Sequence, residues 1–90
     1  MHSQALSARA AVLFASALPT GSRPTDVILD AAVADALHAC GGTPGCVAMM
    51  AATYGDYPET AALRMRWALN VAMSAYGVPR PDPDRELIAA

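Results

Sequence analysis

Glycine and proline divide this 90-residue sequence into four segments of helical length, with breaks at 19–21, 41–42, 55–58 and 77–79. Proline disfavours the helical conformation in the residue before it, and glycine permits positive φ, so helices end at such points. Alanine is the commonest residue and the strongest helix former, whereas β-branched and aromatic residues are too scattered to alternate as a strand does. The sequence therefore predicts an all-α fold, a compact bundle of about four helices with an extended C-terminal tail.

The spacing of apolar residues and end signals gives approximate bounds for these helices. They are expected from about Ser3 to Leu18, from near Pro24 to Cys40, from Thr43 to Gly55 and from Pro58 to Tyr76. The first is predicted to be amphipathic, with one buried stripe formed by Leu6, Ala10, Leu13, Phe14 and Ala17. Thr43 fits an N-cap, Pro44 the first helical position, and Gly77 the C-terminal cap of the last helix.

The chain is predicted to consist of a helical domain, residues 1–77, and a proline-rich, flexible tail, residues 78–90. Pro79, Pro81 and Pro83 block helix formation there and favour an extended conformation. The final Ile-Ala-Ala resembles the alanine-ended tags that bacterial energy-dependent proteases recognise, so a degradation signal is one interpretation of this tail. A frayed terminus is the other interpretation.

Apolar residues make up 54% of the chain and charged residues only 16%. A chain of this length hides only roughly 60% of the surface that its unfolded form exposes. Apolar surface must then stay exposed or be covered by a partner, and we expect a homodimer with a helical interface. The candidate partner-interface residues are Leu63, Trp67, Met65 and Tyr57, on or beside the fourth helix.

Composition also bears on the function class. No apolar run approaches the ~18 residues that a membrane span needs. Arg9, the apolar run after it and Ala15-Ser16-Ala17 imitate a short signal peptide, but an amphipathic first helix is favoured, which predicts a cytoplasmic protein. Arginine supplies every basic residue apart from histidine, and this usage is typical of GC-rich coding, as in an actinobacterium. No carboxylate pair, phosphate-binding loop or catalytic triad is apparent, so we expect no enzyme activity and no cofactor.

Two cysteines and a histidine, His38, Cys40 and Cys46, lie close together in "HACGGTPGC". A zinc site would need another ligand, and only His2 is left to supply it. A disulfide is a second interpretation, although a cytoplasmic chain would keep it reduced. A third is a reactive Cys46 thiolate at a helix N-terminus, with His38 as its base. The simplest interpretation is a pair of buried apolar thiols and no metal.

One pattern of small, turn and polar residues stands out in residues 45–72, "GCVAMMAATYGDYPETAALRMRWALNVA". Successive members of the pattern are four or five residues apart, at Ala51, Gly55, Thr60, Arg64 and Ala68. This pattern resembles the helix-turn-helix of sigma-factor region-four domains and related bacterial regulators. The resemblance implies a helix-turn-helix-like corner in which Ala51 permits a close helix crossing and Gly55 adopts positive φ. It also implies DNA contacts from Glu59, Thr60, Arg64 and Arg66.

Charge weighs against nucleic acid as the partner. The net charge is −2 and no basic stripe is visible, whereas dedicated nucleic-acid binders usually carry one. Asp56 and Glu59 place negative charge where phosphates would approach. The leading interpretation is a small non-enzymatic protein–protein interaction module, an adaptor or regulator. A DNA-binding regulator is the alternative, and a binder of a small apolar ligand between helices is a second one.

Overall fold

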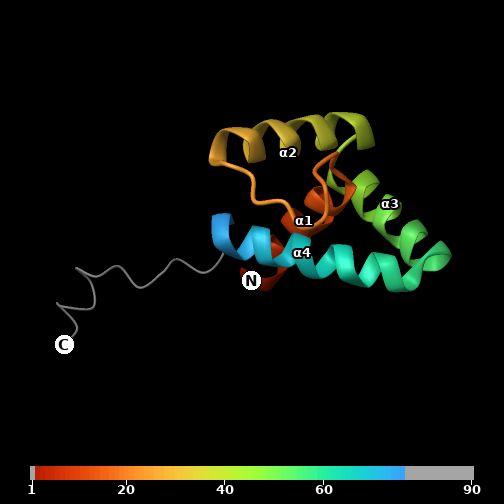
Figure 1. Cartoon of the computed structure of the whole chain (residues 1–90). Coiled ribbons are helices and arrows are strands. Elements are labelled where there is room, and N and C mark those ends of the chain that lie inside the picture. The colour runs from red at the N-terminus through yellow and green to blue at the C-terminus, as the bar shows by residue number, and fades with distance from the viewer. Residues whose placement is uncertain (1, 77–90) are drawn as a thin grey trace.

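The protein is an all-α bundle, as the sequence predicts. The computed structural model describes the backbone of residues 2–76 and the side chains of residues 6–75. Its helices are α1 (His2–Ala15), α2 (Asp26–Cys40), α3 (Thr43–Asp56) and α4 (Pro58–Tyr76) (Figure 1). The predicted tail, the Gly77 cap and the side chain of His2 lie outside the described residues. No helix in the described range combines the length and apolar character that a membrane span needs.

Helix α1 is the centre of the bundle. Figure 1 shows α2 above it, α4 below it and α3 at one end, and α1 packs against all three. Five successive residues, 10–14, are each at most 4% exposed. A helix with apolar residues on every side is buried from every side. The predicted single stripe was therefore incomplete: Ala11 and Val12, outside it, are buried too, whereas Ala17, inside it, is exposed.

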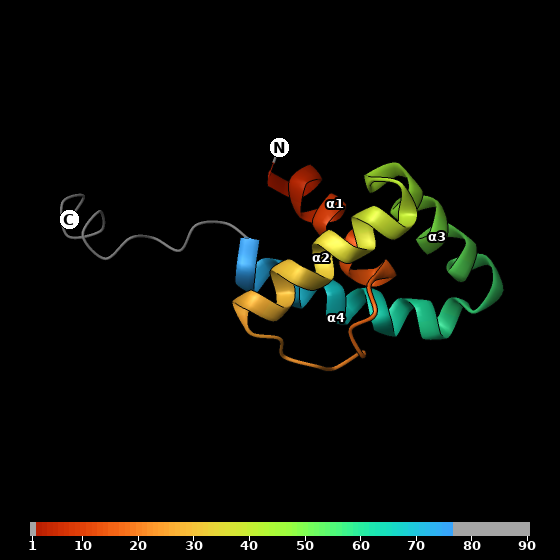
Figure 2. The ribbon, with the colours of Figure 1, turned by 90° about the horizontal axis from the view of Figure 1, so that it is seen from above.

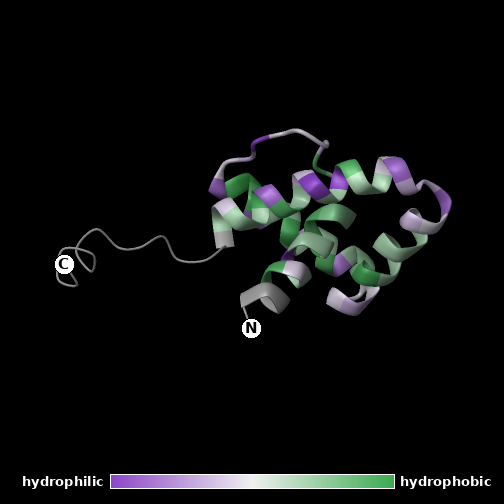
Figure 3. Cartoon of the chain, turned by 90° about the horizontal axis from the view of Figure 1, so that it is seen from below, coloured by the Kyte–Doolittle hydropathy of each residue, from purple (hydrophilic) through white to green (hydrophobic). Residues whose placement is uncertain are grey.

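Helix α4 packs against α1, and its most deeply buried residues are alanines. Ala61, Ala68 and Ala72 are fully buried. Small side chains let two helix backbones approach closely, and this packing leaves the larger residues of α4 at its flanks. Figure 3 shows apolar and polar residues mixed along the length of α4. The predicted bounds of this helix, Pro58 to Tyr76, are confirmed.

The connection from α1 to α2 begins three residues earlier than predicted. The Ser16 hydroxyl donates a hydrogen bond to the Leu13 carbonyl and accepts one from the Leu18 amide. Such local bonds offer the backbone an alternative to helix, so α1 ends at Ala15 instead of Leu18. The connection then runs along one side of the bundle (Figure 2). Thr25 is the N-cap of α2, and its hydroxyl accepts a hydrogen bond from the Ile28 amide.

The turn from α2 to α3 depends on glycines. Gly41 has a left-handed φ of 76° and caps α2, which confirms the predicted stop. The N-cap of α3 is Gly42 instead of Thr43, with Pro44 in the first turn. A Cβ atom on Gly45 would overlap the Cys40 carbonyl oxygen, so the first turn of α3 lies against the end of α2.

Candidate functional site

The four predicted partner-interface residues divide into two pairs. Leu63 and Tyr57 are 60% and 65% exposed and are available to a partner. Trp67 is buried in the core of its own chain, and Met65 packs against that core half-buried. The prediction assigned all four residues to a partner, but Trp67 and Met65 pack against the core of their own chain, and the indole of Trp67 is bonded to the Ser22 carbonyl of the α1–α2 connection.

A different set of residues forms an apolar strip on the outside of α4. Ala62, Leu69 and Met73 are exposed, and Leu69 and Met73 are 37% and 58% accessible to solvent. Their spacing of seven and four residues places them on one side of the helix, with exposed Arg66 between them. We call Ala62, Leu69 and Met73 the outer strip. Sequence reasoning missed it because apolar spacing alone does not say which flank of a helix its neighbours cover.

Arg64 closes the C-terminal end of α1. Its Nε donates to the Phe14 carbonyl at 2.7 Å and its Nη2 to the Ser16 carbonyl at 2.8 Å. Its Nη1 donates to the Thr20 hydroxyl at 2.8 Å. The guanidinium also lies over the Trp67 ring, 4.9 Å from its centroid. Burial lowers the pKa of Arg64, and the positive charge is well placed beside the negative end of the α1 dipole.

The proposed nucleic-acid contacts do not form one surface of free donors. Glu59, Thr60 and Arg66 are exposed, but each guanidinium nitrogen of Arg64 already serves its own chain.

The details expected at the α3–α4 corner also differ. Gly55 lies within α3, and the described glycines with positive φ are Gly21, Gly41 and Gly42. Positive φ at Gly55 was therefore a wrong prediction, because α3 continues to Asp56 and the chain turns at Tyr57. Ala51 is exposed and so does not form a close helix crossing.

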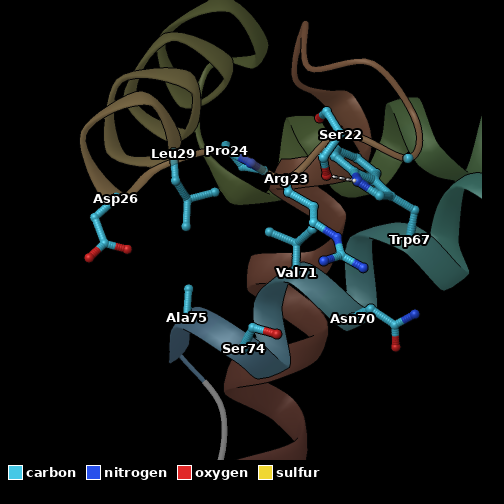
Figure 4. Close-up of a pocket in the computed structure, with 11 residues that line it drawn as sticks. Ser22, Arg23, Pro24, Asp26, Leu29, Trp67, Asn70, Val71, Ser74 and Ala75 are labelled. Carbon is cyan, nitrogen blue, oxygen red and sulfur yellow. Dashed lines mark hydrogen bonds between the residues drawn. The ribbon is translucent and has the colours of Figure 1, made fainter.

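A groove separates α2 from α4, two helices that make few contacts with each other. Its volume is about 560 Å³, and it is open to solvent. The α1–α2 connection forms one wall, and Trp67 joins that wall to α4 because its indole nitrogen donates to the Ser22 carbonyl at 2.8 Å. Figure 4 shows the lining residues: Gly21, Ser22, Arg23, Pro24, Asp26, Leu29, Trp67, Asn70, Val71, Ser74 and Ala75.

The two cysteines are free thiols. Cys46 is fully buried, and its thiol donates a weak hydrogen bond to the Ala36 carbonyl at 3.6 Å. Burial, with a smaller effect of neighbouring Cys40, raises the pKa of the Cys46 thiol to about 11. Burial at this position opposes the reactive-thiolate interpretation and agrees with the simplest one, a buried apolar thiol. No cluster of three potential ligands suited to a metal ion occurs among the described residues.

Comparisons with protein-family models, curated proteins and solved structures found no match to this chain.

Proposed function

We propose that this chain is a small non-enzymatic helical module that binds another protein through the outer strip of α4, and that it forms a homodimer by the same surface. The observation that carries the proposal is the exposure of Leu69 and Met73 on a helix whose other side is already packed against α1. Apolar surface that does not serve the core is stabilised by burial at roughly 25 cal/mol per Å². We also propose the cytoplasm as its location, where thiols such as Cys40 and Cys46 stay reduced.

The geometry of the strip suits a helical partner. The spacing of positions 62, 66, 69 and 73 is the spacing of contact residues on helices that dock into apolar grooves or pack against one another. Arg66 lies between the apolar positions and places a charge beside them, where polar residues commonly surround the apolar centre of an interface. A two-fold arrangement would bring two copies of the strip together, as in most homodimers.

Sedimentation velocity over a range of concentrations tests this proposal. We expect the wild-type chain to shift from monomer to dimer as its concentration rises, and the double variant Leu69→Glu with Met73→Glu to stay monomeric. Leu63→Glu is the matched control, because it makes the same chemical change at an exposed leucine of the same helix outside the outer strip. Circular dichroism of all three proteins checks that the helical fold is kept.

Two results would contradict the proposal. A wild-type chain that stays monomeric at the highest soluble concentration removes the homodimer. Dimers lost in Leu63→Glu but kept in the double variant would move the interface to the other flank of α4.

DNA binding remains the alternative. It would depend on exposed Thr60 and Arg66, since the donors of Arg64 are engaged within the chain. A fluorescence-polarisation titration with random-sequence duplex DNA at low salt tests it. Binding that disappears in Arg66→Gln would favour this alternative.

A further inference from the structure

The groove between α2 and α4 holds an arginine that the fold does not use. Arg23 is exposed on the α1–α2 connection and lines the groove. Figure 4 shows its side chain extending from that connection toward α4. Among the described residues its guanidinium has no hydrogen-bond or ion-pair partner. This contrasts with Arg64, whose three nitrogens are all bonded. An arginine without a partner, held over a concave surface, is a suitable group for binding an anion.

The groove is lined by one other charged residue, Asp26, and its carboxylate does not neutralise Arg23. Asp26 belongs to the first turn of α2, where a negative charge is favoured by the helix dipole. Figure 4 shows its carboxylate at the far edge of the groove, beside Leu29 and away from the Arg23 guanidinium. The positive charge at the Trp67 end therefore remains available to a ligand.

The rest of the lining suits an apolar body attached to that anion. Leu29 and Trp67 are buried residues that line the groove, and half-buried Val71 lies between them (Figure 4). Asn70 and Ser74 are one helical turn apart on α4 and provide an amide and a hydroxyl at the rim. The volume of about 560 Å³ lies within the usual range for small-molecule pockets.

We propose that this groove binds a small amphipathic carboxylate, with its carboxylate on the Arg23 guanidinium and its apolar body against Leu29, Val71 and Trp67. A carboxylate matches arginine because the planar guanidinium can donate two parallel hydrogen bonds to its two oxygens. This ligand class is narrower than the apolar ligand that the sequence suggested. It is also independent of the proposed protein interface, since none of the outer-strip residues lines the groove.

The single tryptophan of the chain provides the measurement, because Trp67 lines the groove. The probe is 4-phenylbutyrate, and its uncharged and cationic analogues 4-phenylbutan-1-ol and 4-phenylbutylamine are the matched ligands. We expect a saturable change in Trp67 fluorescence with 4-phenylbutyrate and a Kd on the order of 1 mM, as ligand efficiency allows for a molecule of this size. Amide NMR shifts of Arg23, Asn70 and Ser74 give a second readout of the same titration.

Arg23→Gln should weaken the binding of 4-phenylbutyrate about tenfold and leave the binding of the alcohol unchanged, because only the charge-assisted bond is lost. Arg66→Gln is the matched control, since it removes an exposed arginine of α4 that does not line the groove. Absence of saturable binding by both readouts at ten times the expected Kd would overturn the proposal. So would an alcohol that binds as tightly as the carboxylate, or an Arg23→Gln variant that binds as the wild type does.

Discussion

Replacing Arg64 by methionine should remove a large part of the stability of this domain. The change deletes two hydrogen-bond donors. One serves the Phe14 carbonyl in the last turn of α1, and the other serves the Ser16 carbonyl directly after that helix. Each lost hydrogen bond from a partly buried charged group costs about 1 kcal/mol or more. The loss of the ring contact with Trp67 adds about 0.5 to 1 kcal/mol. The methionine side chain keeps much of the apolar packing of the arginine stem, so we expect a net loss of about 3 kcal/mol.

That loss is large for so small a domain. A folded unit of this size has a free energy of unfolding of only about 4 to 11 kcal/mol. Urea titrations followed by circular dichroism and by Trp67 fluorescence measure the change, and the thermal midpoint should fall by about 15 °C. Arg64→Lys keeps the charge but not the planar fork, so it should lose about half as much.

Arg66→Met is the matched control, because Arg66 is exposed on the same helix. Surface substitutions of this kind usually change stability by no more than about 0.5 kcal/mol. If Arg64→Met and Arg66→Met have equal effects, the bonds at the end of α1 do not stabilise the fold and the reasoning is refuted.

Three further predictions concern the helix ends and the thiols. Gly45→Ala should destabilise the protein by about 1 to 3 kcal/mol because its Cβ would overlap the Cys40 carbonyl. Gly55→Ala in the same helix meets open space and should stabilise the protein by about 0.5 kcal/mol. Urea titration measures both changes, and equal effects would contradict the prediction. Thr25→Ala removes the N-cap of α2 and should cost about 1 kcal/mol, which a thermal melt will detect against Thr25→Ser as the control that keeps the cap. Iodoacetamide should label half-buried Cys40 well before fully buried Cys46, because the reagent reaches Cys46 only when the structure opens locally. Mass spectrometry of peptides will separate the two sites, and equal labelling rates in the folded protein would contradict the prediction.

Local signals predicted the helices well because they depend on residues close in sequence. Pro58 and the apolar spacing after it gave the full extent of α4, and Gly41 gave the end of α2. The end of α1 was predicted too late, since the hydroxyl of Ser16 competes for the Leu13 carbonyl and no proline or glycine marks that position. Errors of this kind arise where a side chain instead of a backbone preference ends the helix.

The candidate sites depend on contacts that spacing cannot reveal. The hydrogen-bond partners of Arg64 lie 44, 48 and 50 residues earlier in the chain, so the sequence around Arg64 alone is equally consistent with a DNA-contacting surface. Trp67 was predicted to face a partner. The sequence does not reveal that its indole is bonded to the Ser22 carbonyl, 45 residues earlier in the chain. The groove arises because α2 and α4 both pack on α1 and scarcely meet, which follows from the arrangement of whole helices.

The position of α1 has a consequence for how the protein is made. The ribosome releases this helix before any of the helices that cover it, and α4, which packs on it most extensively, comes last of the four. Until residues 58–76 emerge, α1 lacks its most extensive packing partner and keeps part of its apolar surface exposed, the kind of surface that chaperones bind and that aggregates in truncated products. Premature termination before Pro58 should therefore yield an insoluble fragment instead of a smaller stable domain.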